Sequence, residues 1–243
     1  LTINLDNQNG TGGTTSPIYL KYNTGFYSNE ACTSPLSQLA VPTRTGYNFQ
    51  GYYTGENGSG TQVVTSAGAF NDNATRFTTT NATLHAHWTA KTVTITFNAN
   101  DASENGDDTR GNAILGVASL TGVSSGGTLT TNYGSSTLSG TPHATLSGYT
   151  LQGWATTPTG TTYVISSSGA VNGTWTASGD ATSDTVYAIW APIQYTVTLD
   201  PNGGTAGTTS VKAYYGAAMP DIDTLPTRSG YTLDEFRQYS NGT

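Results

Sequence analysis

Three stretches of this 243-residue chain repeat one another in the same order, and this repetition limits the folds that the chain can adopt. Each copy opens with alternating apolar and polar residues: 1–6 (LTINLD), 93–98 (VTITFN) and 195–200 (YTVTLD). Alternation with β-branched residues predicts a strand with one buried face. Each of these strands runs into a turn segment, and Asn-Gly in the first and third turns suits the positive φ of a tight hairpin. The repetition therefore predicts tandem β modules, with 10% aromatic residues available to fill their cores.

Two further markers recur and set the module boundaries. A Gly-Tyr pair appears in every copy, and a closing apolar strand ends in Trp in the first two copies. The distance from Gly46 to Trp88 and from Gly148 to Trp190 is 42 positions in both cases. This spacing predicts modules at residues 1–90, 91–191 and 192–243, the last without its closing strand. The repeated marker residues are Gly46, Tyr47, Trp88, Gly148, Tyr149, Trp154, Trp190, Gly230 and Tyr231.

The marker residues have a structural interpretation. Glycine before each Tyr suits a strand entry with positive φ or no room for a Cβ atom. Trp88, Trp154 and Trp190 are the largest available core fillers in modules whose cores are thin. We therefore expect these aromatic side chains to pack within modules rather than to stack on sugars.

The order of these motifs resembles a known family. The chain carries a strand followed by Asp-x-Asn-Gly-Gly at 200–204, Tyr215-Gly216, Pro-Thr-Arg-x-Gly-Tyr at 42–47 and 226–231, Gly153-Trp154 and a closing Val-Tyr-Ala-Ile-Trp at 186–190. This pattern is similar to the Listeria–Bacteroides repeat, the internalin-type B repeat. The resemblance implies small β-grasp-like modules of about four strands with a short helix or turn, found in tandem on bacterial surface and secreted proteins. We expect a mostly β (α+β) fold of tandem β-grasp-like modules arranged as an extended rod.

The copies differ by insertions and by one missing end. The first hairpin of the second module is about 20 residues longer than that of the others, and the first module carries about nine extra residues around Cys32. The third module stops at Thr243 before any closing strand. Either its own chain or another subunit would supply that strand. Because the sequence opens without Met or a signal peptide, we expect a processed product or a fragment.

Composition narrows the classes of partner. Eight Lys and Arg against 15 Asp and Glu give a net charge of −7, which argues against nucleic acid and anionic membrane surfaces. No apolar run is long enough to span a membrane. Thr- and Ser-rich chains with a single Cys suit export, so we expect an extracellular protein, on the cell surface or secreted. Its expected partners are further repeat modules or other copies of itself, and a host surface or polysaccharide ligand.

Two groups of residues could hold a metal ion. The insertion of the second module gathers oxygen ligands that suit calcium, although their spacing matches no rigid ligand pattern. An expanded, solvated hairpin tip is the alternative for this segment. His85 and His87 share one strand face, but their counterparts Tyr187 and Ile189 indicate an ordinary packing row. No cofactor is expected beyond this possible calcium, whose candidate ligands are Asp101, Glu104, Asn105, Asp107 and Asp108.

Binding and catalysis leave weaker signals. Trp175 lies outside the repeated motifs, and with Tyr52 and Tyr53 it could stack on a sugar ring if exposed. A Gly-x-Ser-x-Gly match at 122–126 lacks the strand-to-helix context of a nucleophile elbow. The sequence therefore predicts a non-enzymatic stalk, adhesin segment or fibre subunit. The alternative is a carbohydrate- or receptor-binding module that uses the second module's insertion and exposed aromatic residues.

Overall fold

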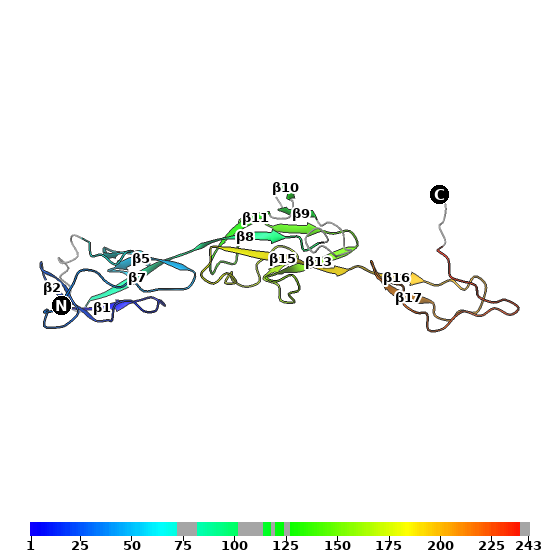
Figure 1. The fold of residues 1–243 in the computed structure, drawn as a ribbon, viewed down its shortest axis with the longest axis horizontal. Helices are drawn as coiled ribbons and strands as arrows, with labels where there is room; N and C mark the ends of the chain where they lie inside the picture. The colour runs from blue at the N-terminus through cyan, green and yellow to red at the C-terminus, as the bar shows by residue number, and fades with distance from the viewer. Residues whose placement is uncertain (72–81, 102–113, 118–119, 124–126, 239–243) are drawn as a thin grey trace. The chain divides into compact units, whose positions relative to one another are not determined.

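The computed structural model describes residues 1–71, 82–101, 114–117, 120–123 and 127–238 (Figure 1). The chain is almost entirely β, with 43% of residues in strands and 1% helical. Among the described residues the helical part is a single 3-10 turn, η1 (Glu56–Gly58). The mostly β part of the expected fold class is therefore confirmed.

The first copy forms a seven-stranded sheet in the order β4-β3-β2-β1-β7-β5-β6. β1 and β7 run parallel, with Ile3 opposite Ala82 and Asp6 opposite His85, and the other neighbouring pairs are antiparallel. The extra residues around Cys32 include the segment 28–34, which separates the short strands β3 and β4. The strands are β1 (Thr2–Asp6), β2 (Ile18–Lys21), β3 (Gly25–Tyr27), β4 (Pro35–Leu36), β5 (Tyr47–Tyr53), β6 (Gln62–Thr65) and β7 (Ala82–Ala90).

One face of this sheet carries the core, as the alternating sequence predicts. Ile3 on β1, Ile18 and Leu20 on β2, and Leu84 and Ala86 on β7 are almost fully buried, and Tyr52 on β5 is 1% exposed. Burying each large apolar side chain contributes roughly 1.5–3 kcal/mol, so a few residues carry most of the stability of this thin core. The buried cluster consists of Ile3, Ile18, Leu20, Phe26, Leu39, Tyr52, Val63, Val64, Leu84 and Ala86.

The second copy builds a five-stranded sheet in the order β11-β8-β15-β13-β14 (Figure 1). Phe97 and the fully buried Trp154 pack edge to face in its core, with ring centroids 4.8 Å apart. Two strands from the long insertion form a small sheet with a third, in the order β10-β9-β12. These strands are β8 (Thr92–Asn98), β9 (Ile114–Val117), β10 (Leu120–Val123), β11 (Thr128–Asn132), β12 (Pro142–Thr145), β13 (Tyr149–Ala155), β14 (Ile165–Ser166) and β15 (Ser183–Pro192).

The first two copies share one strand register. β5 pairs with β7 from Tyr47 opposite Ala90 to Tyr53 opposite His85, with an irregularity between Phe49 and Gly51. In the second copy β13 pairs with β15 in the same way, every residue on both strands shifted by 102 positions, and the irregularity recurs between Leu151 and Gly153. The repeated sequence markers therefore specify the same hydrogen-bond register, including its bulge.

The third copy contributes an antiparallel pair, β16 (Gln194–Thr198) and β17 (Ser210–Tyr214). Contacts group the chain into two compact units: residues 1–96, 128–139 and 171–184 form one, and residues 97–127, 140–170 and 185–243 form the other. The division into modules at 1–90, 91–191 and 192–243 follows the sequence repeat and stays a prediction, as does the β-grasp topology.

Candidate functional site

The aromatic residues proposed for ligand stacking are mostly covered. Trp175 and Tyr52 are both 1% exposed, so neither ring offers a face to a sugar. Tyr53 is half-buried and packs edge to face on His87, with ring centroids 5.7 Å apart. The stacking role assigned to Trp175 and Tyr52 from the sequence is therefore corrected: these side chains are core groups.

The candidate metal ligands do not assemble where the structure can be described. Asp101 is 2% exposed, and Glu104, Asn105, Asp107 and Asp108 lie outside the described residues, as does Ser124 of the Gly-x-Ser-x-Gly match. Within the described ranges no group of three or more His, Cys, Asp or Glu side chains could hold a metal ion. In that same part of the chain, no helix is long and apolar enough to cross a membrane.

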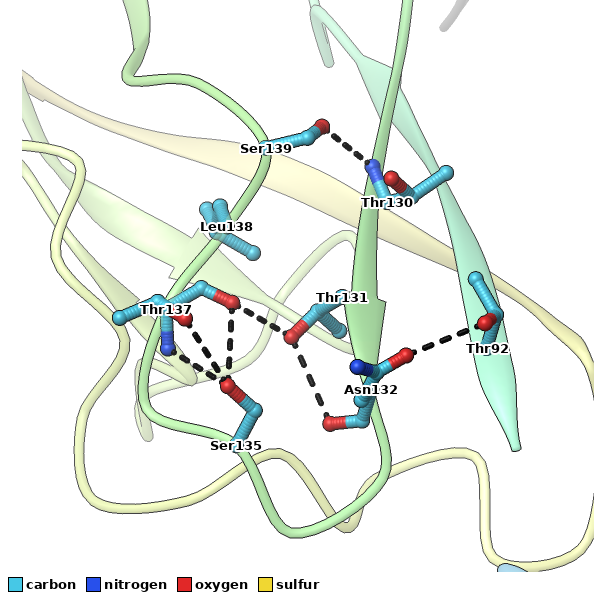
Figure 2. Close-up of a pocket in the computed structure, with 8 residues that line it drawn as sticks. All are labelled: Thr92, Thr130, Thr131, Asn132, Ser135, Thr137, Leu138 and Ser139. Carbon is cyan, nitrogen blue, oxygen red and sulfur yellow. Dashed lines mark hydrogen bonds between the residues drawn. The ribbon is translucent and has the colours of Figure 1, made fainter. Parts of the chain in front are cut away.

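A shallow hollow of about 220 Å³ lies beside β11, lined mainly by hydroxyl groups (Figure 2). The Thr131 hydroxyl donates to the Thr137 carbonyl at 2.6 Å, and the Thr130 amide donates to the Ser139 hydroxyl at 2.8 Å. Figure 2 shows these bonds closing the loop after β11 onto the strand. The hydroxyls thus stabilise the loop, and no titratable side chain lines the hollow.

A network around the first turn explains one difference between the copies. The Tyr52 hydroxyl donates to Asn7 Oδ1 at 2.5 Å, and Trp88 Nε1 donates to the Asn7 carbonyl at 2.9 Å. Burial, followed by the nearby Asp6 carboxylate, raises the pKa of Tyr52 to about 12. In the second copy Trp154 occupies the position of Tyr52 and Ala99 that of Asn7. Ala99 offers no side-chain oxygen, and Trp154 Nε1 has no hydrogen-bond partner among the described residues.

His85 belongs to the same network. Its Nδ1 atom lies 3.2 Å from Asp6 Oδ2 across the parallel β1–β7 pair. The pKa of Asp6 is held below its usual value, first by the Gln8 amide that donates to its carboxylate and also by its hydrogen bond to His85. This arrangement makes the turn after β1 an anchor for the closing strand.

The most specific arrangement lies where consecutive copies meet, and it is built twice. We call Gly46, Tyr47, Lys91 and Tyr133 the first joint. Tyr47 and Tyr133 pack edge to face, with ring centroids 5.6 Å apart at 75°. The first joint lies wholly within the first compact unit.

The second joint consists of Gly148, Tyr149, Ile193 and Tyr215, all within the second compact unit. Tyr149 and Tyr215 pack edge to face with ring centroids 5.6 Å apart at 76°, which reproduces the first joint closely. The glycine and the two tyrosines thus meet in the same geometry at both places, with Ile193 at the position of Lys91.

Backbone hydrogen bonds tie each joint together. The Lys91 amide donates to the Gly46 carbonyl at 2.8 Å, and the Tyr133 amide donates to the Lys91 carbonyl at 2.9 Å. At the second joint the Ile193 amide donates to Gly148 at 2.9 Å, and the Tyr215 amide donates to Ile193 at 3.0 Å. The residue between the closing strand and the next opening strand is therefore bonded on both sides.

Glycine is required at both joints for two reasons. Gly46 and Gly148 have φ of +77° and +80°, which side chains other than glycine rarely adopt. A Cβ atom on Gly46 would lie 2.1 Å from the Tyr133 ring, and one on Gly148 would lie 2.2 Å from the Tyr215 ring. The sequence marked these glycines, but their contact with the following copy was not predicted.

The first joint has an additional clamp. Asp180 accepts hydrogen bonds from Lys91 Nζ at 2.7 Å and from the Gly46 amide at 3.1 Å. These two donors, the Lys91 ammonium first, hold the pKa of Asp180 below its usual value. Trp175 lies on the same segment, and its backbone bonds to Gly134 and Ser135 next to Tyr133. The buried Trp175 therefore anchors the loop that presents Asp180.

Comparison with known proteins adds the family. A family model described as the Listeria-Bacteroides repeat domain matches residues 2–87 and 195–243, more than half of the chain. No curated protein and no solved structure matches. The second copy, residues 91–191, lies outside the matched residues, yet it has the strand register of the first.

Proposed function

We propose that this chain, which belongs to the Listeria-Bacteroides repeat family typical of bacterial surface proteins, is a non-enzymatic extracellular stalk. Its work would be to hold attached parts at a distance from the cell, as a stalk proper, an adhesin segment or a fibre subunit. The observation that carries the proposal is the repeated joint.

The joints support this function because a stalk needs stiff connections between its modules. A flexible linker leaves neighbouring domains free to reorient, whereas each joint here leaves one residue between strands, and both its backbone groups are bonded. The Tyr-on-Tyr contact and the absence of space beside Gly46 and Gly148 restrict rotation further. Arrays whose units contact only their neighbours behave as quasi-one-dimensional rods.

Small-angle scattering tests the extended form. A compact single domain of this length would have a radius of gyration of about 18 Å. We expect a clearly larger radius and an asymmetric distance distribution for the chain. A value near that of a compact globule would refute the stalk.

A spin-label experiment tests the joint itself. Labels on Cys32 and on Ser168→Cys report the spread of distances across the first joint. We expect a narrow distribution in the intact chain and a broad one in Tyr133→Ala. Tyr22→Ala is the matched control, because Tyr22 holds the same repeat position in the first copy and is 52% exposed. Equal widths in the Tyr133 and Tyr22 variants would show that the joint does not restrict motion.

A further inference from the structure

The chain enters and leaves the first copy through two strands that are neighbours in its sheet (Figure 1). β1 opens the copy, and β7 closes it and is followed, after Lys91 alone, by β8 of the second copy. β1 and β7 run parallel, with Ile3 opposite Ala82 at the start of their ladder. Tension along the chain would therefore pull on this one ladder from its two opposite ends.

The direction of the pull decides how a ladder of this kind resists it. In a parallel pair the hydrogen bonds are evenly spaced along both strands. When the strands are pulled lengthwise from opposite ends, these bonds share the load and have to break together. When the strands are pulled apart at one end, the bonds break one after another, and each carries the whole load in turn. The lengthwise pull therefore meets much more resistance than the unzipping pull.

The β1–β7 ladder lies in the protected interior of the sheet. β2 pairs with the other edge of β1, and β5 pairs with the other edge of β7. On the core side of the ladder, Ile3 and Leu84 are fully buried. A hydrogen bond in surroundings of low dielectric constant is stronger than one in water, so this burial strengthens the ladder.

Side chains tie the end of β1 to β7. Asp6 lies opposite His85, and Asp6 Oδ2 lies 3.2 Å from His85 Nδ1. Just beyond the ladder, Trp88 Nε1 donates to the Asn7 carbonyl at 2.9 Å. A lengthwise pull would draw Asn7 toward the start of β7 and Trp88 away from it. The indole bond is therefore loaded together with the ladder.

The second copy repeats the strand order and the indole bond. The chain enters this copy through β8 and leaves it through β15, which lies beside β8 in the five-stranded sheet. Trp190 Nε1 donates at 2.8 Å to the carbonyl of Ala99, the residue after β8. The adjacent entry and exit strands, tied by the closing Trp, are thus a feature of both copies.

We propose that the β1–β7 ladder, together with the bond from Trp88 to Asn7, is a tension lock that allows the first copy to carry a mechanical load without unfolding. The load passes from β1 to β7 and then through Lys91 into the second copy. The tension lock is distinct from the stiffness of the joints, because a rod that resists bending need not resist pulling. A chain with rigid joints and a weak ladder would pass the scattering test and fail a force test.

Single-molecule force spectroscopy on the full chain tests the lock in two pulling geometries. Both versions carry Cys32→Ser and one handle on Leu1→Cys, at a residue that is 40% exposed. For lengthwise pulling the second handle is on Thr89→Cys, at the far end of β7. For unzipping it is on Thr83→Cys, opposite Asn4 near the start of β7. Because forced unfolding follows the unfolding rate, we expect a lengthwise unfolding force at least about twofold above the unzipping force. Equal forces would overturn the proposal.

Two variants separate the lock from overall stability, which is measured by unfolding in urea. Trp88→Phe removes the indole donor but keeps a ring against Phe49, so it should lower the lengthwise force. The unzipping force should stay the same, because unzipping begins at the other end of the ladder. Val64→Ala removes buried volume on β6, off the load path, and should lower stability with little change in the lengthwise force. The proposal is wrong if Trp88→Phe leaves the lengthwise force unchanged, or if Val64→Ala lowers that force equally.

Discussion

Substituting Gly46 by Ala should loosen the first joint, and the structure separates the two causes. The first cause is the backbone: a φ of +77° costs a residue with a Cβ atom roughly 1–2 kcal/mol. The second is steric, because the Cβ atom would lie 2.1 Å from the Tyr133 ring. Displacing that ring from Tyr47 loses an aromatic pair that contributes about 0.5–1.5 kcal/mol. The expected total is about 1.5–3.5 kcal/mol.

A double-mutant cycle with Tyr133→Ala isolates the steric part. With the ring removed, Gly46→Ala should cost only the backbone part, about 1–2 kcal/mol. The assay is hydrogen exchange at the Lys91 amide, whose acceptor is the Gly46 carbonyl. Gly230→Ala, measured by exchange at the Tyr231 amide that closes its turn, supplies a second baseline, because Gly230 has φ +80° and no atom within 4 Å of its Cβ position. If Gly46→Ala accelerates exchange equally with and without the Tyr133 ring, the packing argument is wrong.

Three further predictions concern the turn network and the clamp. Asn7→Ala leaves the buried Tyr52 hydroxyl without its acceptor, so it should lower the free energy of unfolding in urea by about 1–3 kcal/mol. Adding Tyr52→Phe should recover part of this loss. Folding raises the pKa of Tyr52 to about 12. The stability that the neutral Tyr52 hydroxyl contributes is therefore fully present below pH 10, the pKa of the unfolded chain, and is lost as the pH rises toward 12. Tyr52→Phe should flatten this alkaline decline in stability. Because the folded pKa of Asp180 lies below 3.8, its clamp is fully formed above pH 3.8 and is lost as the pH falls through the lower folded pKa. The NMR resonance of the Gly46 amide, which donates to Asp180, should therefore titrate below pH 3.8. It should not titrate in Asp180→Asn.

The repeated sequence was sufficient to predict the strands and their equivalence. Period-two alternation identified β1, β8 and β16, and the equal spacing from Gly46 to Trp88 and from Gly148 to Trp190 anticipated a shared arrangement. The structure turns that spacing into one register with one bulge. The strands and their shared register depend on local residue patterns and on spacing along the chain, so they can be predicted from one sequence.

Burial outside the repeats was harder to predict. Trp175 belongs to no repeated motif, so nothing in the sequence distinguished a sugar platform from a core group. The structure buries it because its segment folds back beside Tyr133 and bonds to Gly134 and Ser135. A Trp that anchors a loop and a Trp that binds a ligand have the same sequence signal.

The sequence by itself determined that this chain repeats a β unit, at which positions the fold requires glycine, and to which family the chain belongs. Only the tertiary structure decided that Gly46 lies under a tyrosine 87 positions away, that Asp180 clamps Lys91, and that β7 lies parallel between β1 and β5. The reason is physical: alternation and turn residues constrain a few neighbouring dihedral angles, whereas contacts between distant segments depend on how all the strands pack together.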